Sequence, residues 1–360
     1  MFFASLVIND FRNFSQEEFR FSQGCNIFYG ANGSGKTSIL EAIYYLILGR
    51  SFRNHLLKKI IRYGQNELVI FGKVEDDREI FSIGISRSVK GGKQLKLNGG
   101  AIQSSIEIAR LIPVHILNQE GFLLLEGEPG IRRKFMDWGL FHVERSYLDI
   151  WRKAGDILKQ RNAAIRERAR VDYIKMWDRE FVSVWNKVHE MRKKYLSLFN
   201  QIVIDSLKKL LPGLSVEIEY FQGWELELDL TSALEKWLRR DLLLGYTTVG
   251  PHRADMQIKI QGRSAKDFLS RGQQKMVIYA FQIAQGVLVK SLTNKSGIYL
   301  VDDILAELDS VSSNLILELL LADRSFQFFF TALESNNLEQ FFASRSIDQK
   351  IFNIINRKFN

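Results

Sequence analysis

The chain has 360 residues, which is enough for roughly two domains of ordinary size. With 46% hydrophobic and 25% charged residues, its composition is typical of a packed globular protein and excludes a largely disordered chain. The formal net charge of +9 permits a polyanionic partner without requiring one, and the single cysteine, Cys25, excludes an internal disulfide and a cysteine-rich zinc site.

The N-terminal part is predicted to consist of short strands separated by turns. Residues 2–8 and 25–29 are β-prone runs. Three further runs predict an antiparallel meander, since turn residues at Asp76-Asp77 and Gly91-Gly92 separate them. These runs are 67–74, 78–88 and 93–98.

The middle of the chain is predicted to be helical. Residues 156–211 contain neither glycine nor proline and are mostly helix formers, and Pro212-Gly213 ends the run. A run of this length is typical of two or three helices. It holds 13 Lys and Arg against 7 Asp and Glu, so it contributes +6 of the net charge. A solvated helical lobe and a face for nucleic acid both fit this charge.

After Gly245 the pattern returns to helices alternating with strands. A helix is predicted at 273–292, and buried strands at 297–301 and 326–331. The two ends of the chain therefore look like one domain, residues 1–118 plus 246–360, interrupted by a helical lobe at 119–245.

A phosphate-binding loop lies between the strand at 25–29 and a helix predicted at 37–48, where apolar residues recur with the helical period and Gly49 follows. The loop fits the pattern G-x-x-x-x-G-K-[ST], whose backbone N–H groups surround phosphate oxygens. We expect Lys36 to reach the β- and γ-phosphates and the Thr37 hydroxyl to hold Mg²⁺. The candidate nucleotide-binding residues here are Gly30, Ala31, Asn32, Gly33, Ser34, Gly35, Lys36, Thr37 and Ser38.

Two carboxylates follow the predicted strand at 297–301. In P-loop ATPases an acid at the end of a buried strand completes the magnesium site, so we expect Asp302 to hold the metal, directly or through water. Asp303 would face the γ-phosphate and position or deprotonate the attacking water, which makes Asp303 and Lys36 the candidate catalytic residues.

A third segment, Ser270-Arg271-Gly272-Gln273, stands at the predicted start of the helix at 273–292. A hydroxyl, free N–H groups and the helix dipole can bind a phosphate there, although Ser270 also fits an ordinary N-cap. The order of the motifs favours function: phosphate loop, this segment, acidic strand, and then Ala306-Glu307-Leu308-Asp309.

That order resembles the ABC-type ATPases, and within them the SMC-like branch and its RecF family. The resemblance covers nearly the whole chain. Four further segments carry it, and the last two are the most specific: DFRNF at 10–14, GRSFRN at 49–54, GEPGIRRKFMD at 127–137 and TVGPHRADM at 248–256.

The resemblance implies an α/β fold, a P-loop ABC-type ATPase head with a mixed sheet and an antiparallel β subdomain, interrupted by a helical lobe. It implies ATP and Mg²⁺ as cofactors. Ser270 and Gly272 would contact the γ-phosphate bound to the opposite protomer, and Gln273 is a further candidate for nucleotide binding. Arg12, Asn13 and Arg53 would lie near the nucleotide. Asp303 stands where most relatives have glutamate, which fits slow hydrolysis.

The chain departs from the family pattern at several positions. The usual Pro-Glu pair is missing from HILNQEGF at 115–122, so Gln119 is only a candidate for the glutamine that contacts magnesium. Ala254 replaces an acid, although Asp255 remains. His252 fits either the site or a tight Gly-Pro turn.

Two arginines near the helical lobe are open to two interpretations. Arg132 and Arg133 could reach phosphate or DNA, but we expect them to be solvated, as exposed arginines usually are.

The function implied by the resemblance is that of a weak, switch-like ATPase in DNA replication, recombinational repair and the SOS response. ATP would drive dimerisation on duplex DNA near single-strand gaps, and RecR, together with RecO, would then help to load RecA. No leader peptide or apolar run of membrane-spanning length is recognised, so we expect a cytoplasmic protein with no membrane partner.

Three other functions fit less well. A transporter ATPase would need a switch histidine, where this chain has Thr331 after the strand at 326–330. A small-molecule kinase does not explain LSRGQQK at 269–275. A structural SMC protein needs long heptad arms, for which 156–211 is too short.

Overall fold

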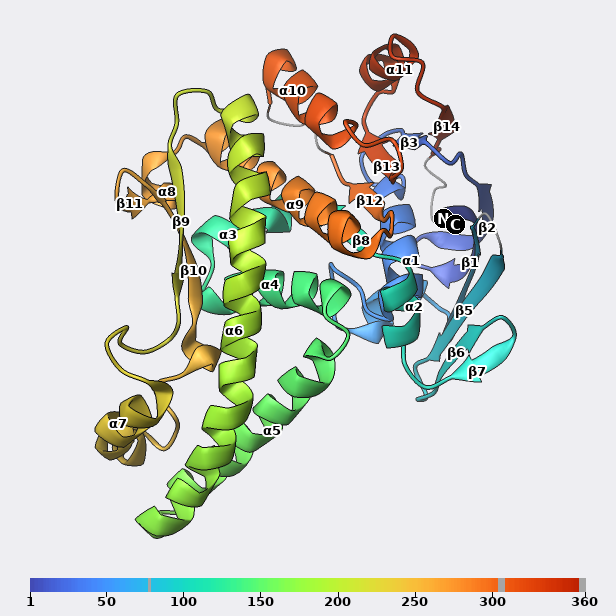
Figure 1. Ribbon diagram of the computed structural model, residues 1–360. Coiled ribbons are helices and arrows are strands. Elements are labelled where there is room, and N and C mark those ends of the chain that lie inside the picture. The colour runs from blue at the N-terminus through green and yellow to red at the C-terminus, as the bar shows by residue number, and fades with distance from the viewer. Residues whose placement is uncertain (77–78, 304–307, 356–360) are drawn as a thin grey trace. The chain divides into compact units, whose positions relative to one another are not determined.

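The computed structural model describes residues 1–76, 79–303 and 308–355 (Figure 1). The chain forms two compact units. The first consists of Met1–Gln119 and Asn294–Asn360, and the second of Glu120–Thr293.

The first unit contains a six-stranded antiparallel sheet in the order β2-β1-β4-β5-β6-β7. Its strands are β1 (Phe2–Phe11), β2 (Phe14–Arg20), β4 (Glu67–Glu75), β5 (Ile80–Ser88), β6 (Lys93–Leu97) and β7 (Gly100–Ile102). The predicted meander is β4-β5-β6, in which each strand pairs with the next. The turn residue Asp77 lies outside the described residues.

A five-stranded sheet in the same unit has the order β14-β3-β13-β12-β8, and every pair in it is parallel. Its strands are β3 (Cys25–Tyr29), β8 (Val114–Leu117), β12 (Ile298–Val301), β13 (Gln327–Ala332) and β14 (Gln349–Asn353). The α/β fold with an antiparallel part is therefore confirmed, but the parallel and antiparallel strands form separate sheets. Because the strands are parallel, their carboxyl ends share one edge.

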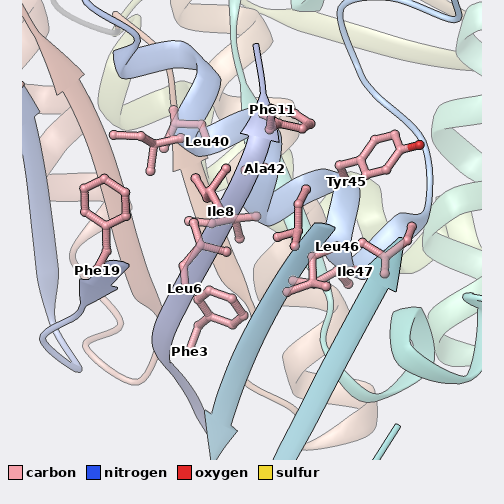
Figure 2. Packing of buried hydrophobic residues seen from close by; sticks show 14 of the residues in the cluster. Phe3, Leu6, Ile8, Phe11, Phe19, Leu40, Ala42, Tyr45, Leu46 and Ile47 are labelled. Atoms are coloured by element: carbon pink, nitrogen blue, oxygen red, sulfur yellow. The ribbon is translucent and has the colours of Figure 1, made fainter. Parts of the chain in front are cut away.

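Helix α1 (Lys36–Leu48) contacts strands of both sheets. This explains why nearly all of its faces are apolar and why nine of its residues are buried. Figure 2 shows Leu6 and Ile8 of β1 within the same packed cluster as Leu46 and Ile47 of α1. The remaining helical elements of this unit are η1 (Leu57–Lys59), α2 (Ile106–Leu111), α10 (Ser310–Leu320) and α11 (Asn336–Ala343).

The second unit is mainly helical. Its helices are α3 (Leu123–Glu126), α4 (Pro129–Val143), α5 (Tyr147–Arg166), α6 (Val171–Leu210), α7 (Leu230–Leu244), α8 (Ala265–Phe268) and α9 (Arg271–Thr293). A three-stranded antiparallel sheet joins β9 (Val216–Phe221), β10 (Asp255–Ile260) and β11 (Arg263–Ser264). Two 3₁₀ turns complete it, η2 (Gln119–Phe122), which begins at the last residue of the first unit's N-terminal segment, and η3 (Pro251–Arg253).

The glycine-free and proline-free run predicted as two or three helices forms the end of α5 and all of α6. The chain turns between them at Arg168, whose φ of 52° is left-handed. The amides of Arg168 and Ala169 bind the carbonyls of Ile165 and Ala164, which closes α5 without a glycine.

The compact units divide the chain differently from the predicted domains. Residues 246–293, which the sequence assigns to the ATPase domain, pack within the second unit. The physical reason is that β10 pairs with β9 and that α9 packs on α6, where the rings of Phe281 and Phe199 are 5.4 Å apart.

Among the described residues, α9 is the one helix long and apolar enough to cross a membrane by length and composition. The sequence analysis missed it because polar residues interrupt its apolar runs. Within its most apolar window, 67% is buried inside the protein, where α9 packs on α4 and α6. The apolar surface of α9 is therefore accounted for by the core of the second unit.

Candidate nucleotide site

The phosphate loop joins β3 to α1 through backbone conformations that require glycine. Gly35, the N-cap of α1, has φ 113°, and a Cβ atom there would lie 2.5 Å from the Asn13 side chain. Asn13 Nδ2 donates a hydrogen bond to the Ser34 carbonyl at 2.9 Å, so the loop is held from outside as well. Because the N-cap has no side chain, the first N–H groups of α1 remain available to an anion.

Lys36 lies over the loop to which it belongs. Its Nζ donates to the carbonyls of Gly30 at 2.8 Å and Ala31 at 3.0 Å. Burial lowers the pKa of Lys36, while the charges of Asp303 and Asp302 act in the opposite direction. The amine therefore lies against the backbone of the phosphate loop, within the electrostatic field of both acids.

The acid at the end of β12 meets the phosphate loop. The Thr37 hydroxyl donates to Asp302 Oδ1 at 2.9 Å, across 265 positions of sequence. Burial raises the pKa of Asp302, and the hydrogen bonds from Thr331 and Thr37 oppose that shift. A hydroxyl and a carboxylate oxygen are the hard donors that Mg²⁺ prefers, so this pair fits the expected metal.

Asp303 is exposed and has a φ of 54°, an uncommon value for a residue other than glycine. Its backbone N–H donates to the Thr331 hydroxyl at 2.9 Å. Ala306-Glu307, part of the last motif, lie outside the described residues. Asp309, which ends that motif, is the N-cap of α10, where its side chain accepts from the Ser312 amide at 2.8 Å.

Gln119 lies two positions beyond the end of β8 and is exposed. Because β8 pairs with β12, Gln119 follows the same sheet edge as Asp302, whose amide binds the Leu117 carbonyl at 2.8 Å. Gln119 thus follows the strand next to β12, at the edge where the acids lie, and its contact with magnesium stays a prediction.

Arg12 and Arg53 both bind a residue that the sequence analysis did not single out. Glu41 of α1 is fully buried and accepts a two-pronged contact from the Arg12 guanidinium. Arg53 lies 3.6 Å from the same carboxylate, and the Ser51 hydroxyl donates to it. The sequence held one signal for this role, since Glu41 is a charged residue among the apolar residues of α1. Glu41 therefore ties the segments at 10–14 and 49–54 to the helix of the phosphate loop.

The segment Ser270-Arg271-Gly272-Gln273 lies in the second unit, at the start of α9. The Ser270 hydroxyl accepts from the Gln273 amide at 3.3 Å, and the Gln273 side chain accepts from the Ser270 amide at 3.0 Å. This is a capping box, so the N-cap interpretation of Ser270 holds. Nothing lies within 4 Å of a Cβ built on Gly272, so this side of the helix start is open.

The two most family-specific segments bind each other in the second unit. Arg132 forms a two-pronged ion pair with Asp255, at 2.7 and 3.0 Å, and Arg133 donates to the Ala254 carbonyl at 2.6 Å. The expectation that these arginines are solvated is wrong, because the chain folds the 127–137 segment against the 248–256 segment. Sequence spacing held no signal for this pairing.

His252 is a structural residue of the second unit. Its Nε2 is 3.1 Å from the Thr247 carbonyl, and its ring contacts those of Phe181 and Trp185. Burial lowers its pKa to about 3. These contacts favour the tight-turn interpretation over a role at the nucleotide.

The sequence was compared with protein families and with known proteins. The profile of the family described as RecF/RecN/SMC N terminal domain matches residues 2–353. The chain is 39% identical to "DNA replication and repair protein RecF" of Shewanella pealeana, over 93% of this chain and 92% of the relative. Its identity to the protein of the same name from Salmonella arizonae is 37%, over 94% of each chain.

Solved structures are similar in fold. A structure of the recombination mediator protein RecF-ATP in the RecFOR pathway has a TM-score of 0.83 and 25% identity, over 92% of each chain. An Smc head bound to the C-winged helix domain of ScpA has a TM-score of 0.58 and 16% identity, over 93% of this chain and 90% of the other.

Proposed function

The chain belongs to the RecF/RecN/SMC family and, within it, to the RecF proteins. From this premise we propose that it is an ATP-dependent DNA-binding protein of replication and recombinational repair. Its relatives carry DNA replication and repair in their names, and one solved neighbour is a RecF-ATP structure. We place its action in the cytoplasm, where chromosomal gaps arise.

One observation supports ATP binding most directly, namely the contact of Thr37 with Asp302 at 2.9 Å. It joins the phosphate loop to the strand-end acid, the two parts that a P-loop ATPase brings together around a metal. Thr37 and Asp302 would hold Mg²⁺, with Gln119 as a further candidate, and Mg²⁺ would neutralise phosphate charge. Lys36 would leave the loop carbonyls to bind phosphate, and Asp303 would orient the attacking water.

We further propose that hydrolysis is slow and acts as a switch. Ser270, Gly272 and Gln273 of a second copy would complete each site, so ATP would favour a two-fold dimer on duplex DNA near single-strand gaps. RecR would bind this dimer and, with RecO, promote loading of RecA. Loss of the γ-phosphate would remove the contact between each nucleotide and the second copy, and so release the dimer.

The transporter alternative gains no support. The residue at the position of a switch histidine is Thr331. Its hydroxyl hydrogen-bonds to the Asp302 carboxylate and accepts from the Asp303 backbone N–H.

The proposal is tested by sedimentation velocity with and without ATP·Mg²⁺ and a gapped duplex. The wild type should become dimeric with ATP and bind the duplex, while Lys36→Ala should remain monomeric because it loses the phosphate contact. Affinity for DNA should fall steeply with salt, since phosphate contacts release counterions. A wild type that binds ATP yet stays monomeric at all protein concentrations would contradict the switch.

A further inference from the structure

Thr331 connects two neighbouring strands at the edge where the acids lie. It is the last residue but one of β13, which stands between β3 and β12, and its exposed fraction is 3%. Its Oγ1 is 2.8 Å from Asp302 Oδ1 and 2.9 Å from the Asp303 amide nitrogen. One buried hydroxyl therefore contacts the carboxylate of Asp302 and the backbone amide of Asp303.

The directions of these two hydrogen bonds are fixed by chemistry. The Asp303 N–H can only donate, so the Thr331 oxygen accepts it and directs its single proton to Asp302. Asp302 Oδ1 thus accepts hydroxyl protons from Thr331 and from Thr37. Within residues 1–76, 79–303 and 308–355 the other oxygen, Oδ2, accepts no hydrogen bond. The arrangement holds the carboxylate by one oxygen and leaves the second one open.

The backbone at Asp303 needs such support. Its φ of 54° is left-handed, a conformation that is strained for a residue other than glycine and persists only where neighbours hold it. The hydrogen bond from its N–H to Thr331 holds the backbone of Asp303, whose exposed carboxylate acts electrostatically on Lys36. The Thr331 hydroxyl therefore helps to maintain the left-handed backbone conformation of Asp303.

We propose that Thr331 is a positioning residue that fixes Asp302 for the metal and Asp303 for the attacking water through a single hydroxyl. This inference rests on the proposed ATPase function.

The test compares Thr331→Val, which keeps the shape and removes the hydroxyl, with Thr331→Ser, which keeps the hydroxyl. In the nucleotide-free protein, hydrogen exchange at the Asp303 amide should be about 10-fold faster in the valine variant and close to wild type in the serine variant. The Mg²⁺ concentration for half-maximal binding of a fluorescent ATP analogue should rise about 10-fold in the valine variant alone. Binding of the analogue without Mg²⁺ should be unchanged.

If Thr331→Val misfolds, Thr331→Ala removes the hydroxyl without placing a methyl group against Asp302. Equal Mg²⁺ dependence in wild type and the hydroxyl-free variant would overturn the inference, and so would equal impairment of the serine variant. Failure of the wild type itself to bind the analogue would instead overturn the proposed function, so the two failures are distinguishable.

Discussion

Buried charged side chains in this protein bind partners from distant segments. Glu41 holds Arg12, Arg53 and Ser51 in the first unit. In the second unit, fully buried Arg161 binds Asp178, Asp241 and Thr247, at 2.7, 2.8 and 2.7 Å. Removing one partner of a buried pair typically costs 3–5 kcal/mol, roughly, because the other charge stays buried alone. Glu41 therefore fixes the segments at 10–14 and 49–54, and Arg161 joins α5 to α6 and α7.

The first prediction at this scale concerns His252, whose pKa burial lowers to about 3 from an ordinary 6.5. Nearby Arg253 and Arg133 also disfavour its protonation. The unfolded chain binds a proton below the ordinary pKa and the folded chain does not. The free energy of unfolding should therefore fall as pH decreases from 6.5 toward 3.

Between pH 7 and pH 5 this histidine alone should remove about 2 kcal/mol of stability. His252→Gln should lose that part of the pH dependence, while His55→Gln, at an exposed position, should keep it. Urea unfolding followed by tryptophan fluorescence is suitable, because all six tryptophans lie in the second unit. Equal pH slopes in wild type and His252→Gln would contradict the buried neutral histidine.

At the scale of elements, helix ends carry most of the candidate chemistry. The start of α1 has no side-chain cap, so its N–H groups are free for phosphate. The start of α9 is closed by the Ser270–Gln273 capping box. The start of α9 therefore has a structural role in addition to the proposed contact with the other protomer's nucleotide.

A pair of variants separates the two roles of Ser270. Ser270→Ala should cost about 1 kcal/mol of stability through the lost cap, whereas Ser270→Asp keeps a capping oxygen. Both should abolish ATP-driven dimerisation, since alanine removes the hydroxyl and aspartate repels the phosphate. Tryptophan fluorescence in urea gives the stability and sedimentation gives the dimer. An aspartate variant that dimerises normally would limit Ser270 to capping.

At the scale of the whole molecule, the proposed ATP switch determines how much positive charge is brought to the DNA. A dimer would carry twice +9, or +18, and α5 and α6 supply much of this excess. The charge of +18 attracts duplex DNA only while the dimer exists. In the proposed switch, the dimer exists only while ATP is bound.

Asp303→Asn tests this link, because an amide cannot accept the proton of the attacking water. The variant should bind ATP and dimerise like the wild type but release phosphate at least about 10²-fold more slowly, so the dimer should persist on DNA. Dissociation after dilution is the measurement, and the double variant with Lys36→Ala should be monomeric throughout. Phosphate release at the wild-type rate would remove Asp303 from its role.

Local sequence predicted the elements of the candidate site well. The glycine spacing of the phosphate loop, the apolar run ending in Asp302-Asp303 and the periodicity of 37–48 each depend on neighbouring residues only. The fold class and the RecF family, predicted from these motifs and their order, are confirmed.

The family pattern of the motifs led us to expect Thr37 and Asp302 at one metal site, but only the tertiary structure brought Thr331 to Asp302 and Arg132 to Asp255. The contacts of Asp302 with Thr37 and Thr331, and of Arg132 with Asp255, join positions 265, 29 and 123 apart. They depend on strand order and on packing, since β13 comes to lie between β3 and β12 and β10 pairs with β9. Such long-range pairings leave no periodic trace in either partner. The sequence by itself therefore identified the loop and the two acids, but not that the Thr331 hydroxyl binds Asp302 and Asp303.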